Sequence, residues 1–291
     1  MSTVAPPKGR PAAPAPRVAA PPPKQQTSPA AAGSPLKTAR TFAVQRGPKD
    51  DAHKIVIYGP GGVGKTELCS LLSQVGIEPL FVDLEGSSSF LDVSRLDPAP
   101  ESFNEVRDAL HGDLSGFGAV VIDSVSKAEE LARDFVIENV PHEKGPSVVI
   151  RSIEDYGWGK GYMHIYEAML LVLQDLDAIA RKGIHVLCVC HDATEKVPNP
   201  AGEDFLQWQP RLQSPPKQGK LRERVKEWCD HLFYIGWDRF VDKEGKATGS
   251  GTRTIYPCEL PTHWAKSRVL DSVVPYHRGD AELWRQLFGK Q

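Results

Sequence analysis

The sequence predicts an α/β fold in which helices cover a mostly parallel β-sheet. Two observations predict it. From residue 54 onward, short apolar runs alternate with stretches of helical periodicity, and a glycine-rich turn joins the first apolar run to the first helical stretch. Parallel strands need a crossover connection between them, which is usually a helix, so this alternation is typical of a helix-covered parallel sheet.

The predicted strands are five short apolar runs rich in β-branched or aromatic residues. They are Ile55–Tyr58, Leu80–Leu84, Ala119–Ile122, Ile184–Cys190 and His231–Ile235. Five other stretches have the apolar spacing of amphipathic helices. They are Lys65–Gln74, Ser102–His111, Ser124–Glu138, Tyr162–Ala180 and Leu221–Cys229. We expect the chain to end in a C-terminal β-hairpin and a short helix, which comprise Asp238–Val241, Arg253–Tyr256 and Asp280–Phe288.

Residues 1–50 differ from the rest in composition. They contain 11 Pro and 11 Ala, and eight Lys or Arg against a single acid, Asp50. This segment therefore carries a charge of +7, whereas the chain as a whole carries −2. With few large apolar side chains it cannot offset its ordering entropy, so we expect a disordered basic arm, either a solvated linker or a weak contact for nucleic acid or a partner. Residues 51–291 then form the folded domain.

Several classes of protein are excluded by what the sequence lacks. No run of 18 apolar residues could span a membrane, and the first 20 residues have no apolar segment of a signal peptide. The five cysteines are odd in number and show no C-x-x-C spacing. We therefore expect reduced thiols, no zinc site and a cytoplasmic protein, in the host cytoplasm if the chain is phage-encoded.

The glycine-rich turn matches the phosphate-binding loop pattern G-x-x-x-x-G-K-[ST]. Glycines let backbone N–H groups curl around a phosphate, and the helix that follows adds partial positive charge at its N-terminus. The lysine supplies a cation to the β- and γ-phosphates, and the threonine offers a hydroxyl to Mg²⁺. The sequence thus predicts a site for ATP, formed by Gly59, Pro60, Gly61, Gly62, Val63, Gly64, Lys65 and Thr66.

An acid at the end of a second buried strand should complete a magnesium site. Asp123 directly follows the apolar run Ala119–Ile122. A carboxylate there can hold Mg²⁺ through water, together with Thr66. The alternative is that Asp123 only caps the helix that follows.

Hydrolysis also needs a group that orients or deprotonates water. Glu85 ends the predicted strand Leu80–Leu84 and is our candidate base, whereas Asp83 should face the opposite side of the strand. His191 ends another strand and could sense the γ-phosphate. Alternatively, Glu85 only caps its loop and His191 is structural.

In this order the motifs resemble the RecA-like branch of the P-loop ATPases, and within it the phage-encoded, Sak-type group linked to single-strand annealing. The resemblance covers about residues 50–290. It rests on six segments, which are Ile57–Thr66, Val82–Gly86, Val121–Ser124, Ser152–Gly157, Gly159–Tyr162 and Trp264–Arg268. It implies a RecA-like P-loop NTPase fold and supports Glu85 as the residue that activates water.

The resemblance also implies two DNA-binding loops, at about residues 141–161 and 192–220. The first contains a mixture of cations and aromatics suited to a backbone and its bases. They are Arg151, Trp158, Lys160 and Tyr162. A second, basic cluster comprises Lys217, Lys220, Arg222, Arg224 and Lys226. The alternatives are an ordinary loop for the first set and a solvated helix face for the second.

Ala265–Arg268 is similar to the K-N-R motif of the bacterial RadA family, with Ser267 in place of asparagine. By that analogy Lys266 or Arg268 would act in trans, as an arginine finger does, on a neighbouring subunit's nucleotide. The alternative is a simple surface turn.

Taken together, these patterns predict a Mg²⁺-dependent ATPase that binds or anneals single-stranded DNA in phage-type recombination. We expect a homo-oligomer, either a ring or a filament, with a possible single-strand-binding protein as partner and no membrane contact. Two alternatives stay open: a nucleotide-dependent switch that binds protein, and a motor ATPase of the helicase or packaging type.

Overall fold

The computed structural model describes residues 44, 46, 51–145, 147–241 and 247–289. The chain divides into two units, residues 1–48 and 49–291, and every element below belongs to the second. The predicted disordered arm lies outside the described residues except for positions 44 and 46, so its disorder and the boundary at residue 50 stay predictions.

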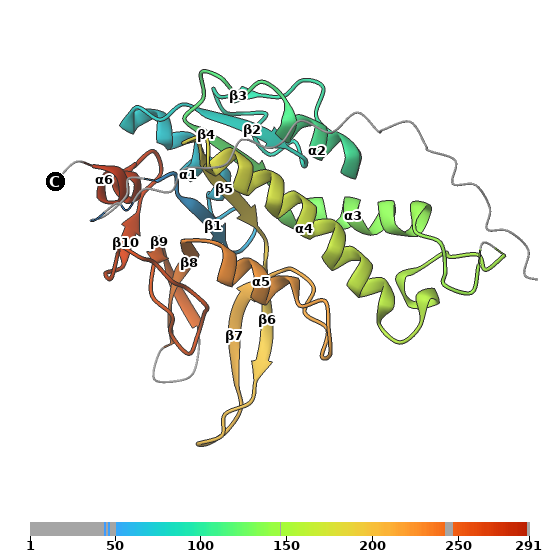
Figure 1. Cartoon of the computed structure of the whole chain (residues 1–291). Helices are drawn as coiled ribbons and strands as arrows, with labels where there is room; N and C mark the ends of the chain where they lie inside the picture. The colour runs from blue at the N-terminus through green and yellow to red at the C-terminus, as the bar shows by residue number, and fades with distance from the viewer. Residues whose placement is uncertain (1–43, 45, 47–50, 146, 242–246, 290–291) are drawn as a thin grey trace, which may run out of the picture. The chain divides into compact units, whose positions relative to one another are not determined.

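An eight-stranded sheet forms the centre of the second unit (Figure 1). In spatial order its strands are β10 (Val274–Tyr276), β9 (Ala247–Tyr256), β8 (His231–Val241), β1 (Lys54–Tyr58), β5 (His185–Cys190), β4 (Ala119–Asp123), β2 (Pro79–Asp83) and β3 (Ser94–Arg95). From β8 to β3 all neighbours are parallel, and β9 and β10 add antiparallel pairs. The predicted mostly parallel sheet with a C-terminal hairpin is therefore confirmed.

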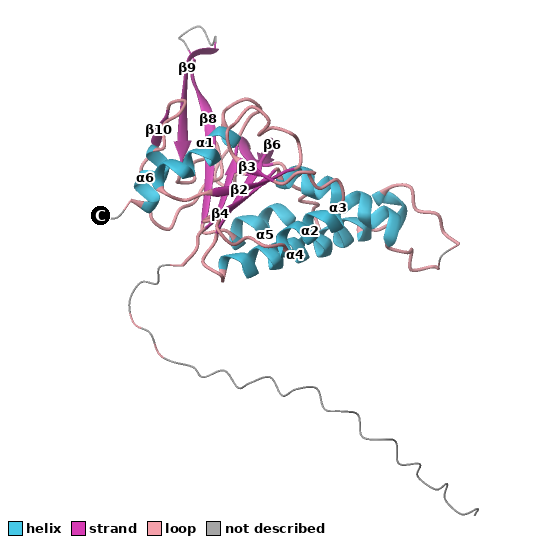
Figure 2. Ribbon diagram, turned by 90° about the horizontal axis from the view of Figure 1, so that it is seen from above, coloured by secondary structure: helices cyan, strands magenta, loops and turns pink. Residues whose placement is uncertain are grey.

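Helices cover both faces of this sheet (Figure 2). One face carries α2 (Phe103–His111), α3 (Val125–Asn139), α4 (Lys160–Ala180) and α5 (Leu221–Trp228), and the other carries α1 (Lys65–Ser70), with the 3₁₀ turn Leu71–Val75 after it, and α6 (Glu282–Phe288). Alternate residues of each strand enter opposite cores. In β1, Val56 and Tyr58 pack under α2–α5, whereas Ile55 and Ile57 pack under α1 and α6.

The structure also contains strands that the sequence pattern did not predict. Residues Asp192–Val197 (β6) and Phe205–Pro210 (β7) form a separate two-stranded hairpin, which extends away from the main sheet in Figure 1. Their partly polar alternation and the prolines between them are typical of a loop. The short strands β3 and β10 were missed because three residues or fewer carry no periodic signal. The two runs predicted at 231–235 and 238–241 are one strand, β8.

Parallel pairing places the carboxyl ends of β1, β5, β4 and β2 at one edge of the sheet. The segments that begin there are the P-loop, His191, Ser124 and the loop after Asp83. Ser124 begins α3 by accepting a hydrogen bond from the Lys127 backbone N–H over 3.1 Å. The sequence therefore brings its candidate residues together by strand order rather than by proximity in the chain.

Candidate active site

The turn between β1 and α1, residues Gly59–Thr66, needs glycine at two positions for different reasons. Gly64 has a φ of 99°, which L side chains rarely adopt. A Cβ atom at Gly59 would lie 2.1 Å from the Ile235 carbonyl oxygen, so the loop packs directly against β8 there. These two glycines fix the path of the loop.

Lys65 is only 8% exposed and folds back over this loop. Its Nζ donates to the carbonyl oxygens of Gly59 (2.7 Å) and Pro60 (3.0 Å). Burial lowers the pKa of its ammonium group, and the nearby Asp123 carboxylate partly offsets this. A buried cation held only by neutral carbonyls gains strongly from an anionic partner such as a phosphate.

The two predicted metal-binding residues lie in direct contact. Thr66 Oγ1 donates to Asp123 Oδ2 over 2.6 Å, and Ser87 Oγ donates to the same oxygen over 2.7 Å. Burial raises the pKa of Asp123, against the effect of these two hydrogen bonds. Mg²⁺ is usually held by one or two protein oxygens plus phosphates and water, so this donor set fits Mg²⁺ bound with a nucleotide.

Glu85 lies beside this pair and is held by two donors. Ser124 Oγ donates a short hydrogen bond to Glu85 Oε1, and His191 Nε2 lies 3.1 Å from both carboxylate oxygens. Burial alone would raise the pKa of Glu85, but the bonds from Ser124 and His191 outweigh it and lower the pKa. The structure thus brings Glu85 and His191 together in one contact, with the carboxylate ionised near neutral pH.

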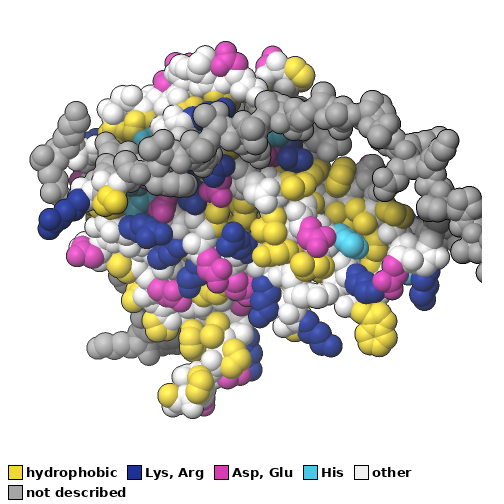
Figure 3. Space-filling model, in the orientation of Figure 1, with side chains coloured by type: hydrophobic (Ala, Val, Ile, Leu, Met, Phe, Trp, Pro, Cys, Tyr) yellow, Lys and Arg dark blue, Asp and Glu magenta, His cyan; other side chains and the backbone are white. Residues whose placement is uncertain are grey.

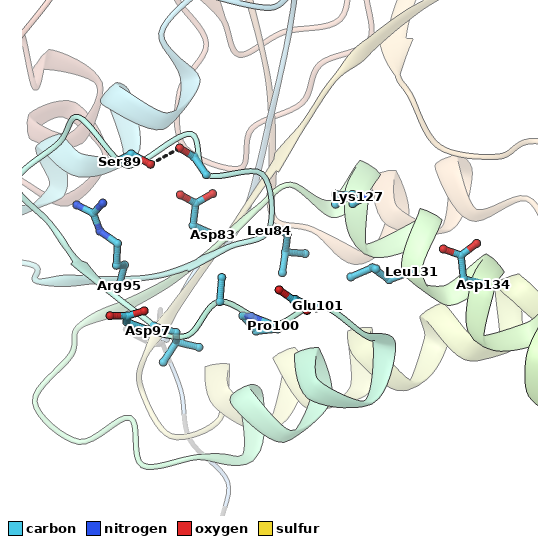
Figure 4. Close-up of a pocket in the computed structure, with 13 residues that line it drawn as sticks. Asp83, Leu84, Ser89, Arg95, Asp97, Pro100, Glu101, Lys127, Leu131 and Asp134 are labelled. Atoms are coloured by element: carbon cyan, nitrogen blue, oxygen red, sulfur yellow. Dashed lines mark hydrogen bonds between the residues drawn. The ribbon is translucent and has the colours of Figure 1, made fainter.

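The loop that carries Glu85 separates two cavities. Glu85, Ser87 and the P-loop line a cavity of about 370 Å³. A larger cavity of about 790 Å³ lies on the other side of the loop, where Asp83 and Ser89 line it (Figure 4). Asp83 holds the loop in shape, because its carboxylate accepts the backbone N–H groups of Glu85 (3.2 Å), Ser87 (3.1 Å) and Ser88 (2.8 Å).

Sequence reasoning missed three contributors to this site: Ser87, Ser124 and the loop-holding role of Asp83. Their signal was present but weak. A serine run, Ser87–Ser89, begins two residues after the predicted base, and Ser124 directly follows the predicted metal ligand. What each hydroxyl contacts depends on strand order, which the local sequence does not contain.

Lys266 and Arg268 lie at the other end of β1 and β8. Lys266 pairs through its backbone with Leu232, and its Nζ lies 3.4 Å from the Glu227 carbonyl oxygen. Arg268 Nε donates to Asp230 Oδ1 over 2.9 Å, with a side chain that is 70% exposed. Neither residue therefore joins the cavity beside Lys65 within the same chain.

Most residues predicted to contact nucleic acid lie at the surface, but Arg222 is buried. Arg151, Lys217, Lys220 and Arg224 are exposed, and Lys160 forms an ion pair with Glu143. Arg222 is only 7% exposed. Its guanidinium donates to the Leu212 carbonyl and Gln209 and pairs with Glu195, so it belongs to the interior and we remove it from the predicted contact set.

The two predicted nucleic-acid segments are joined by one side chain. Gln213 Nε2 donates to the carbonyl oxygens of Tyr162 (2.7 Å) and Gly219 (3.0 Å). A Cβ atom at Gly219 would lie 2.8 Å from the Tyr162 oxygen, so the two backbones are in contact. Figure 3 shows Lys and Arg side chains recurring on the part of the surface where α4 begins and α5 lies.

The strand–loop–helix turn, its buried lysine and the strand-end carboxylate that contacts its threonine define a P-loop nucleotide-binding protein. Residues 51–269, most of the chain, match the family model described as an AAA domain. The chain therefore belongs to the AAA domain family and is a P-loop ATPase, with the predicted mostly parallel, helix-covered α/β fold.

Comparison with solved structures gives two examples of similarity. A RadB recombinase is 16% identical over 70% of this chain and 80% of its own, with a TM-score of 0.34. A KaiC-like protein from Pyrococcus horikoshii OT3 is 9% identical over 78% of this chain and 86% of its own, with a TM-score of 0.38. A comparison with curated protein sequences finds no match. In the part of the chain that the structure describes, no helix has the length and apolar character needed to cross a bilayer.

Proposed function

We propose that this P-loop ATPase hydrolyses ATP with Mg²⁺ and couples hydrolysis to the binding and annealing of single-stranded DNA, as in the phage-encoded, Sak-type group that its motifs resemble. The DNA part of the proposal rests on an exposed aromatic side chain in a segment that also contains cations. Trp158 is 93% exposed and has a φ of 52°. Non-glycine residues with such a φ cluster at ligand-binding and switch regions, which supports a functional role for this position.

In this proposal each residue at the sheet edge has one task. Lys65 and the loop amides hold the β- and γ-phosphates, and Thr66 with Asp123 holds Mg²⁺, which would neutralise phosphate charge. Glu85 orients the attacking water and accepts its proton, because its carboxylate is ionised at neutral pH. His191 keeps Glu85 in place and lies close enough to the same cavity to contact the γ-phosphate.

The proposed DNA contact, which we call the Trp158 patch, comprises Arg151, Trp158, Lys217, Lys220 and Arg224. These exposed residues come from two stretches of chain whose backbones meet at Tyr162 and Gly219. Indole rings stack on bases of any sequence, and the cations attract the phosphate backbone. The hairpin β6–β7 is a weaker candidate for DNA. Its 19 residues, 192–210, contain four acids and a single lysine.

Two contacts support a route from this patch to the nucleotide. The Arg211 backbone N–H donates to the His191 carbonyl oxygen over 2.8 Å, and His191 contacts Glu85. Residue 211 also begins the segment that leads through Gln213 to Lys217 and Lys220. Displacement of this segment by DNA would therefore move the residue that holds Glu85.

The proposal includes assembly into a homo-oligomer with the ATP site between subunits. Its support is the position of Lys266 and Arg268 at the sheet edge opposite the P-loop, away from this chain's own nucleotide site. In this proposal they act on the nucleotide of another copy. A heterologous contact of this kind builds rings or filaments. A single-strand-binding protein as partner and a cytoplasmic location, compatible with five free cysteines, complete the proposal.

The test is the ATPase rate with and without single-stranded DNA, together with annealing of complementary strands. We expect DNA to raise the rate, and Trp158→Ala to weaken DNA binding by about tenfold, because a stacked base contributes about 1–3 kcal/mol. The matched control is Leu206→Ala, which removes another exposed apolar side chain on β7 and should change neither. No stimulation and no annealing would favour a protein-binding switch, and strand unwinding would favour a motor.

A further inference from the structure

Each peptide carbonyl of the P-loop needs a hydrogen-bond donor, because buried backbone groups are rarely left unpaired. Lys65 serves the carbonyls of Gly59 and Pro60. The carbonyl of Val63 accepts instead from Arg253 Nη1, over 2.9 Å. Arg253 lies 190 residues away in sequence, on β9, so a distant part of the chain supports the loop from behind.

Arg253 is the centre of a row of three side chains across the antiparallel strands. The strand register pairs it with Trp237 of β8 and with Tyr276 of β10. Its guanidinium carbon lies 5.3 Å from the Trp237 ring centre and 4.6 Å from that of Tyr276. A guanidinium held between two aromatic faces loses little further freedom when it donates a hydrogen bond.

This row presses directly against the loop. A Cβ atom at Gly64 would lie 2.8 Å from Arg253 Nη1 and 3.1 Å from the Tyr276 ring. Tyr276 is 2% exposed, and its hydroxyl lies 3.4 Å from the Gly64 carbonyl oxygen. The space that a side chain at position 64 would need is therefore filled by Arg253 and Tyr276.

We infer that Arg253 is a positioning residue for the bound triphosphate, acting through the Val63 carbonyl rather than by touching a phosphate. The inference rests on ATP binding at the P-loop. When the Lys65 ammonium turns toward a phosphate, Gly59 and Pro60 lose their donor, whereas the bond from Arg253 can remain. Hydrogen bonds from a charged group are stronger than neutral ones, so Arg253 keeps the loop amides oriented before and after ATP binds.

The experiment measures the Kd of Mg-ATP by calorimetry, without DNA, on the full chain. Arg253→Met should weaken binding by about tenfold or more, because a hydrogen bond from a charged group is worth about 1.5–3 kcal/mol. The kcat at saturating ATP should stay within about twofold. Arg253→Lys keeps the charge and should recover part of the affinity. The matched control is Arg285→Met, an exposed arginine on α6 whose partners are the surface acids Asp280 and Glu282.

An unchanged Kd of Mg-ATP for Arg253→Met would overturn the inference, whether or not kcat falls. If that variant fails to fold, Trp237→Leu tests the same row from its exposed side, and an unchanged Kd there also overturns it. Lys65→Ala, measured alongside, separates the claim that ATP binds at the P-loop from the claim that Arg253 positions that loop. If Lys65→Ala loses ATP while Arg253→Met does not, only the role of Arg253 is wrong.

Discussion

The nucleotide site and the Trp158 patch are built in opposite ways. At the nucleotide site Lys65 and Asp123 are buried, and each has at least two polar partners. In the Trp158 patch the candidate contacts are exposed, and Gln213 holds the backbone at Tyr162 and Gly219. Chemistry on a phosphate requires groups held in fixed geometry, whereas contact with a flexible strand requires groups that are free to reach it.

Glu85→Gln, at the nucleotide site, should give the largest effect on activity. Removing the proposed base should lower kcat for ATP by about a hundredfold or more, because general-base catalysis is worth about 10²–10⁴. The Kd of Mg-ATP should change little, since glutamine keeps the shape and most contacts. Steady-state kinetics and calorimetry measure the two. Wild-type turnover in Glu85→Gln would show that another group activates water, and Glu203→Gln, an exposed glutamate near the hairpin turn, is the control.

Glu129 connects the two regions, and its substitution should have the next largest effect. Here the effect is on the free energy of unfolding rather than on kcat. Glu129 is 6% exposed on α3 and accepts the backbone N–H of Gln213 over 2.9 Å. The side chain of Gln213 joins the two stretches of the Trp158 patch. Burial raises the pKa of Glu129 to about 7, well above its ordinary value. The folded chain therefore keeps a proton that the unfolded chain has lost, and the free energy of unfolding falls as pH rises from about 4.5 to 7.

Glu129→Gln removes that dependence while keeping the acceptor for Gln213. At pH 8 the variant should be more stable than the wild type by about 2–3 kcal/mol, and near pH 4.5 the two should be similar. Denaturant unfolding at both pH values measures the difference. Equal stability at pH 8 would mean that the buried carboxylate of Glu129 is ionised without a cost in stability. Glu129 would then not connect the nucleotide site to the Trp158 patch in the way described.

Ser124→Ala should give the smallest effect, a modest fall in kcat, because it removes only one of the two donors to Glu85. Losing this hydrogen bond should raise the pKa of Glu85, move the acidic limb of the kcat profile to higher pH and lower kcat by about three- to tenfold. The substitution also removes the cap of α3. Ser102→Ala is the matched control, because it removes the cap of α2 without touching the site. Equal loss of activity in both variants would assign the effect to helix stability.

Much of the nucleotide site could be predicted from the sequence because its spacing is local. The loop Gly59–Thr66 is contiguous, and Asp123 and Glu85 each end an apolar run, so the parallel sheet brings them together. The bond between Ser124 and Glu85 spans 39 residues and depends on β4 lying beside β2, which no local pattern specifies.

The Trp158 patch was harder to predict. A helix with alternating charges does not reveal which arginine faces inward, and so Arg222 was placed on the surface although it is buried. The support of Val63 by Arg253 was also beyond the sequence, because it depends on the register of three antiparallel strands.

The central claim is that the loop Gly59–Thr66 binds the polyphosphate of ATP with Lys65 as its cation. Calorimetry of Lys65→Ala with Mg-ATP tests it most directly, against Lys182→Ala, an exposed lysine beyond the end of α4. Losing a charged hydrogen bond to phosphate should weaken binding of Lys65→Ala by about a hundredfold, and the control should bind as the wild type does. Undiminished affinity in a folded Lys65→Ala variant would contradict the account.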